Sequence, residues 1–165
     1  MPGLTPEVRG TFARTDRFDS KGAGLSAYGR ADSEWDVLVD AGREFLIERA
    51  KLGKLTSYTE LSVTLAGRTG CRAFDFGRAD ERAAMGHLLG LIVERDQSLA
   101  PSDPPLMLSA LVNYLNANDA GTGFYQLAKE LGLLPMSASK DEKFSFWINQ
   151  VKRLYERHGA SSPLV

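Results

Sequence analysis

Residues 106–132, LMLSALVNYLNANDAGTGFYQLAKELG, are the segment around which we expect the rest of this chain to pack. Its first nine residues are mostly apolar and predict a strand, and residues 123–132 predict a short helix. The asparagines and glycines between them predict a hairpin or wide turn, because they tolerate left-handed backbone. Only Asp119, Lys129 and Glu130 are ionised between residues 106 and 134. We therefore expect a buried scaffold whose turn serves as a wing.

Working outward, four further segments carry apolar residues at helical spacing, and they predict helices over residues 33–51, 58–66, about 78–96 and 141–159. Ser33 with Asp36, and Ser57 with Glu60, have the spacing of capping boxes. Gly53 and Gly67 are expected to end the first two helices. Gly86 and Gly90 lie four residues apart on one helical face, which predicts close helix packing or contact with a ligand backbone.

The expected fold class is mainly α with a small β-hairpin, arranged as a winged helix-turn-helix-like centre flanked by N- and C-terminal helices. Residues 1–31 contain two prolines and five glycines and predict an extended, partly mobile arm. Its basic and aromatic residues leave two roles open, contact with a phosphate backbone or attachment to the domain. Residues 32–165 are expected to form one globular domain, with a winged-helix-like core over about 54–132 and a C-terminal helix over about 141–159.

Composition excludes several classes of protein. Lys and Arg (20) nearly balance Asp and Glu (21), so the whole molecule has no field that would attract nucleic acid. The single cysteine, Cys71, excludes an internal disulfide and a cysteine-based zinc cluster, and it fits a cytoplasmic protein. No apolar run approaches the roughly 20 residues of a membrane span.

No catalytic, cofactor or metal motif stands out, so we expect a protein that is not an enzyme and has no cofactor or metal site. The two histidines, His87 and His158, are too few for a histidine-rich metal centre. An enzyme that uses Asp75, Glu81 or His87 in a cleft is the less favoured alternative.

Positive charge accumulates around the middle helices. Between Arg49 and Arg82 there are seven basic and four acidic residues, and two short helices joined by a basic turn are typical of a helix-turn-helix. The sequence therefore predicts binding of nucleic acid, through contacts to the phosphates of double-stranded DNA. The residues expected to make these contacts are Lys54, Ser57, Tyr58, Arg68, Arg72, Arg78, Arg82 and Asn116. The alternative is a module that binds a protein partner or a second copy of itself, and the near-zero net charge favours this alternative.

Three short motifs resemble the DNA-binding domain of alkyltransferase-like proteins and the O6-alkylguanine alkyltransferases. They are LTSYTEL at residues 55–61, LAGR at residues 65–68, and AMG with LG at residues 84–86 and 89–90. The resemblance covers roughly residues 54–125 and implies a winged-helix scaffold that contacts DNA. Leu108 stands where that family has its acceptor cysteine, and Ala83 stands where it has an arginine that enters the duplex. The resemblance therefore implies neither alkyl transfer nor base flipping.

Overall fold

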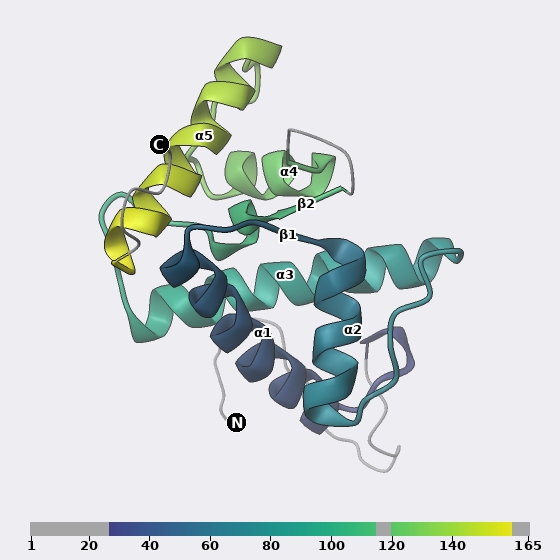
Figure 1. The fold of residues 1–165 in the computed structure, drawn as a ribbon. Helices are drawn as coiled ribbons and strands as arrows, with labels where there is room; N and C mark the ends of the chain where they lie inside the picture. The colour runs from purple at the N-terminus through teal and green to yellow at the C-terminus, as the bar shows by residue number, and fades with distance from the viewer. Residues whose placement is uncertain (1–26, 115–119, 160–165) are drawn as a thin grey trace, which may run out of the picture.

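The computed structural model describes residues 27–114 and 120–159, and the helices in this part of the chain surround a very small sheet (Figure 1). The expected class, mainly α with a small β element, is confirmed. Asn116 and residues 1–26 of the predicted arm lie outside the described residues. The elements are η2 Ala27–Gly29, α1 Asp32–Leu52, β1 Thr56–Ser57, α2 Tyr58–Thr69, α3 Ala79–Leu99, η3 Leu108–Leu111, β2 Val112–Asn113, α4 Thr122–Glu130 and α5 Lys140–Arg157.

Local capping explains where two of the helices begin or end as predicted. Ser57 caps α2, since its hydroxyl accepts a hydrogen bond from the Glu60 amide at 3.0 Å. Gly53 follows α1 with a left-handed φ of 66°. The structure corrects the end of α2, which continues past Gly67 to Thr69 and is followed by Gly70, whose φ is 78°.

The predicted capping box at Ser33 and Asp36 is wrong, because α1 begins after Ala31 and has no side-chain cap. A box that we had not predicted opens α5. There the Ser139 hydroxyl accepts from the Glu142 amide, and the Glu142 carboxylate accepts from the Ser139 amide.

The small sheet differs from the expected hairpin. β1 and β2 pair in parallel, Thr56 with Val112 and Ser57 with Asn113. The one antiparallel pairing among the described residues is an isolated bridge between Asn113 and Ala120. The strand predicted at the start of residues 106–132 shortens to two residues, because Leu108–Leu111 form a buried 3-10 turn. A short apolar run does not separate these conformations, since both can be buried on every side.

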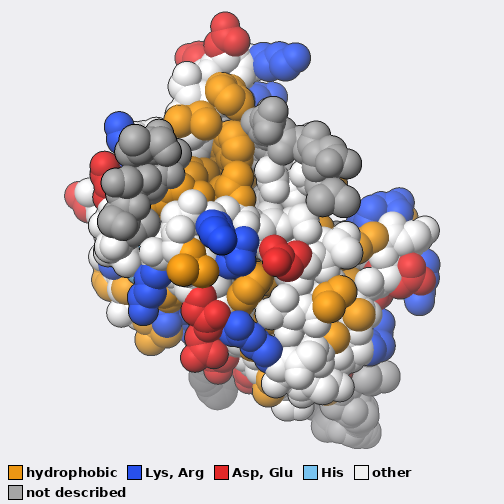
Figure 2. All heavy atoms as spheres, viewed as in Figure 1, with side chains coloured by type: hydrophobic (Ala, Val, Ile, Leu, Met, Phe, Trp, Pro, Cys, Tyr) orange, Lys and Arg blue, Asp and Glu red, His pale blue; other side chains and the backbone are white. Residues whose placement is uncertain are grey.

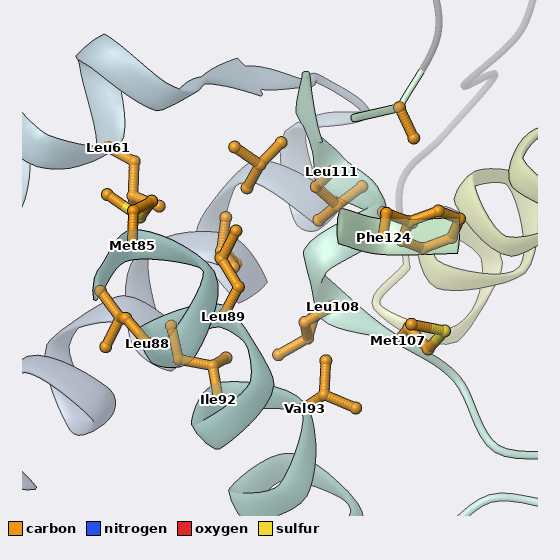
Figure 3. Close-up of a cluster of buried hydrophobic side chains, with 14 of the residues drawn as sticks. Leu61, Met85, Leu88, Leu89, Ile92, Val93, Met107, Leu108, Leu111 and Phe124 are labelled. Atoms are coloured by element: carbon orange, nitrogen blue, oxygen red, sulfur yellow. The ribbon is translucent and has the colours of Figure 1, made fainter. Parts of the chain in front are cut away.

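The core forms where α3 meets α1 and α2 on one side and the 106–112 segment with α4 on the other (Figure 3). Leu88, Ile92, Leu108 and Leu111 are all fully buried. The expected buried scaffold is thus present, although in another backbone conformation. None of the helices in the described part of the chain is long and apolar enough to cross a bilayer.

α5 is joined to this scaffold by two buried polar contacts. The Trp147 indole N–H donates to the Ala110 carbonyl at 2.7 Å, and the Met107 amide donates to the Gln150 side-chain oxygen at 2.7 Å. Both contacts satisfy backbone groups in a segment that has little regular structure of its own. The C-terminal helix therefore completes the fold by supplying these partners.

Close packing of a helix on a glycine does occur, but at a position that we had not predicted. A Cβ added to Gly42 of α1 would lie 2.5 Å from Cδ1 of Ile92 on α3. Added at Gly86 or Gly90, it would have no heavy atom within 4 Å. The prediction of tight helix packing at Gly86 and Gly90 is therefore wrong, and these glycines face open space.

Candidate functional site

Arg68, the first arginine among the predicted phosphate contacts, is paired with a carboxylate of α1. Both ends of its guanidinium group donate to Glu48, each at 2.9 Å, and the group lies 5.2 Å from the centre of the Phe45 ring. This hydrogen bond is the main reason why the pKa of Arg68 is raised and the pKa of Glu48 is lowered. The Glu48 carboxylate therefore neutralises most of the positive charge of Arg68.

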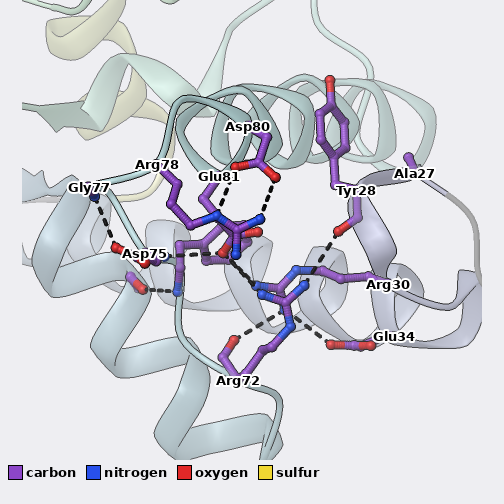
Figure 4. Close-up of polar contacts among 12 residues, drawn as sticks. Ala27, Tyr28, Arg30, Glu34, Arg72, Asp75, Gly77, Arg78, Asp80 and Glu81 are labelled. Atoms are coloured by element: carbon purple, nitrogen blue, oxygen red, sulfur yellow. Dashed lines mark hydrogen bonds and ion pairs between the residues drawn. The ribbon is translucent and has the colours of Figure 1, made fainter.

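Arg72 and Arg78 point toward the acidic first turn of α3 (Figure 4). Arg72 donates to the buried Glu81 carboxylate at 3.1 Å, and Arg78 makes two hydrogen bonds to Asp80, the shorter at 2.7 Å. The bond to Asp80 is the main cause of the raised pKa of Arg78. Arg82 has a different partner, because it donates to the Phe76 carbonyl at 2.7 Å.

Arg30 completes this network, and sequence analysis had placed it only in the N-terminal arm. Its guanidinium group is fully buried, lies 4.2 Å from the centre of the Phe74 ring and donates to Glu34 and to the Arg72 carbonyl, each at 3.1 Å. It also lies 3.7 Å from the Glu81 carboxylate. Arg30 therefore joins the α2–α3 connection to the start of α1, a role that depends on contacts more than 40 residues apart.

The remaining predicted residues do not extend these arginines into one basic surface. Lys54 is exposed, Ser57 serves as a helix cap, and Tyr58 is largely turned inward. Figure 2 shows basic side chains beside acidic ones on the face in view, rather than a continuous basic patch. Nucleic-acid binding therefore stays a prediction that these ion pairs do not favour, since neutralised arginines attract phosphates weakly.

A large groove runs between α3 and α4 and has a volume of about 1300 Å³. Gly86 and Gly90 lie along its α3 side, where they leave backbone uncovered. The apolar residues that line it are Phe76, Met85, Leu89, Leu91, Val93, Pro105, Phe124, Leu127 and Leu131. This groove, which we call the α3–α4 groove, was not predicted, although the glycine spacing had marked one side of it.

Tyr58 closes one end of the α3–α4 groove. Its ring centre lies 5.0 Å from that of Tyr114, and burial raises the pKa of Tyr58 to about 12. A Cβ added to Gly121, the residue before α4, would lie 2.5 Å from the Tyr58 hydroxyl oxygen. The absence of a side chain at Gly121 therefore lets the N-terminus of α4 pack against this tyrosine.

One buried hydroxyl borders the groove without a partner. Ser109 is 3% exposed, and its Oγ has no hydrogen-bond partner among the described residues. Buried polar atoms in folded proteins are nearly always paired, so an unpaired one marks a position where a ligand can contribute a hydrogen bond. His87 also lines the groove, where its ring packs 4.9 Å from the centre of Trp35, and burial lowers its pKa.

The residues considered for an enzyme do not form a catalytic set. Glu81 accepts from Arg72 and from the Asp75 amide, and the Asp75 carboxylate accepts from the Gly77 amide. His87 packs against aromatic rings instead of either carboxylate. Within residues 27–114 and 120–159, no group of three His, Cys, Asp or Glu side chains could hold a metal ion.

Comparison with protein-family models, with curated proteins and with solved structures gives no match for this chain. The resemblance to alkyltransferase-like proteins and the winged-helix arrangement therefore stay predictions.

Proposed function

We propose that this protein is an interaction module that binds an apolar segment of a partner protein in the α3–α4 groove. The observation that carries the proposal is the open space above Gly86 and Gly90, where neither position has a heavy atom within 4 Å of an added Cβ. Glycine destabilises a helix interior by about 1 kcal/mol relative to alanine. Two such residues beside an apolar groove allow another backbone to approach α3 closely.

The size of the groove supports a polypeptide rather than a single small molecule. Its volume of about 1300 Å³ exceeds the roughly 300–1000 Å³ of most small-molecule pockets. The α3 residues that line it extend from Arg82 to Gln97, which corresponds to about 22 Å of helix. An amphipathic helix of about four turns has this length, and binding of such a helix in an apolar groove is a common mode of recognition.

The proposal is tested by filling the groove at a position where the fold can accept a side chain. Gly86→Leu places four carbon atoms in the groove, and Gly67→Leu is the matched control, because Gly67 also has open space around it but lies on α2 outside the groove. Both substitutions replace a helical glycine, so both are expected to raise the free energy of unfolding by up to about 1 kcal/mol.

The binding probe is a fluorescein-labelled, 16-residue amphipathic helix with leucines at positions i, i+3, i+4 and i+7, titrated by fluorescence anisotropy. We expect the unmodified protein and Gly67→Leu to bind it equally, and Gly86→Leu to bind at least tenfold more weakly. Equal binding by Gly86→Leu, or no binding by the unmodified protein, would overturn the proposal.

The second proposal is that the protein binds DNA through Lys54, Ser57, Tyr58, Arg68, Arg72, Arg78 and Arg82. Under either proposal we place the protein in the cytoplasm. Support for the second proposal comes from the exposure of Arg72 and Arg78, whose side chains are 49% and 59% exposed. Their pairing with Glu81 and Asp80 makes this proposal the weaker one.

A further inference from the structure

The α3–α4 groove has one electropositive and one electronegative end. In Figure 1, α3 and α4 run in the same direction, so their N-termini lie at one end of the groove and their C-termini at the other. A helix carries about half a positive charge at its N-terminus and half a negative charge at its C-terminus. The two helices therefore add their dipoles instead of cancelling them.

The ionised side chains that line the groove follow the same order. Asp80 and Glu81, in the acidic first turn of α3, and Lys129, in the last turn of α4, do not line it, and the two carboxylates are paired with Arg78 and Arg72. Arg82, in the first turn of α3, lines the positive end and is exposed, and its contact is the Phe76 carbonyl. Among the described residues, no carboxylate forms an ion pair with it. At the other end, Glu94 and Glu130 are both exposed, and Glu130 accepts a hydrogen bond from the neutral Gln126 side chain.

From this charge order we propose that the partner of the groove is an amphipathic helix with acidic residues at one end and basic residues at the other. The acidic end lies beside Arg82, the apolar face covers Gly86 and Gly90, and the basic end lies beside Glu94 and Glu130. This proposal rests on the proposed function, because it names the chemistry of the segment that the groove binds.

The direction of the partner helix follows from helix chemistry. Acidic residues stabilise the first turn of a helix and basic residues the last turn. In the partner helix, two carboxylates in the first turn carry more negative charge than the half positive charge of its N-terminus. The N-terminal end of the partner helix is therefore negative overall. The partner helix therefore runs parallel to α3, with its first turn at Arg82.

Three 16-residue peptides with the same leucine face test the charge order. The first has two glutamates in its first turn and two lysines in its last turn, the second has lysines at both ends, and the third has glutamates at both ends. Exposed ion pairs contribute modestly, so we expect the first peptide to bind about three- to fivefold more tightly than the other two at low salt. This difference should shrink as salt is added.

Charge reversal on the protein provides the second measurement. Arg82→Glu should weaken binding of the first peptide about fivefold and strengthen binding of the all-lysine peptide. Lys152→Glu is the matched control, because it makes the same charge change at an exposed position of α5 outside the groove. It should leave the order of the three peptides unchanged.

A nitroxide on the first turn of the first peptide reports direction, since it should broaden the amide NMR signals of Ala83 and Gly86 more than those of Glu94 and Gln97. Three results would overturn the proposed polarity while leaving the groove as a binding site. They are equal affinities for all three peptides, stronger broadening of the Glu94 and Gln97 signals, and no gain in the affinity of Arg82→Glu for the all-lysine peptide. Failure of all three peptides to bind would instead overturn the proposed function.

Discussion

Gly121→Ala should destabilise this protein through a clash with the Tyr58 hydroxyl group. The backbone itself accepts alanine, since φ at Gly121 is −74°. The added Cβ would lie 2.5 Å from the Tyr58 hydroxyl oxygen and 3.2 Å from Cε2 of Tyr114. Overpacking of this kind costs about 1–3 kcal/mol, and loss of a glycine at the residue that caps α4 adds about 1 kcal/mol. The expected loss in the free energy of unfolding is therefore about 2–4 kcal/mol.

Tyr58→Phe isolates the clash, because it removes the oxygen and keeps the ring. The Tyr58 hydroxyl makes no hydrogen bond to the described residues, so Tyr58→Phe alone should change stability by less than about 1 kcal/mol. Combined with Gly121→Ala, it should recover about 1–3 kcal/mol, leaving mainly the cost of the lost cap.

Urea unfolding followed by circular dichroism at pH 7 measures all four proteins of this cycle. Gly123→Ala is the control. Gly123 lies in the first turn of α4, two residues after Gly121, and its added Cβ would have no heavy atom within 4 Å. It should stabilise by up to about 1 kcal/mol. Additive effects of Gly121→Ala and Tyr58→Phe would refute the packing argument.

Three further predictions concern charge. Glu81→Gln should lower the free energy of unfolding by about 2 kcal/mol, because it removes a buried carboxylate that is paired with Arg72 and with the fully buried Arg30. Asp80→Asn at the exposed pair should cost less than about 1 kcal/mol, and urea midpoints compare the two variants. The pKa of Tyr58 is raised from 10.0 to about 12, so its contribution to stability should be present below pH 10 and lost as the pH rises from 10 to 12. Tyr58→Phe should lack this loss, and equal alkaline decreases in the two urea midpoints would contradict the assignment. A 20-base-pair duplex titrated at 20 and 200 mM salt should bind no more tightly than roughly 10⁻⁴ M at the higher salt, and nanomolar affinity would instead support the DNA proposal.

Several features could be predicted from the sequence because they depend on residues close together in the chain. Apolar spacing predicted the limits of the five α-helices in the described part of the chain to within about three residues, but neither 3-10 helix; Ser57 and Gly53 marked two of those limits correctly. Such signals succeed because a cap or a helical face involves residues only a few positions apart. The low charge of residues 106–134 likewise predicted burial without specifying a backbone conformation.

The candidate site depended on contacts between distant segments. The excess of arginines was visible in the sequence, but their partners were not. Arg68 meets Glu48 where α2 packs on α1, Arg72 meets Glu81 where the α2–α3 connection folds back on α3, and Arg30 meets the Arg72 carbonyl where that connection reaches the start of α1. A count of charges cannot predict this cancellation, because the interaction depends on distances of a few ångströms.

The glycines separate the features that follow from local sequence from those that depend on packing between distant segments. The sequence determined that Gly42, Gly86 and Gly90 lie within helices, because the surrounding apolar period requires it. Tertiary structure decided that Gly42 packs against Ile92 while Gly86 and Gly90 face the α3–α4 groove. A glycine has no side chain whose polarity could indicate burial, so its surroundings depend entirely on what the rest of the fold places beside it.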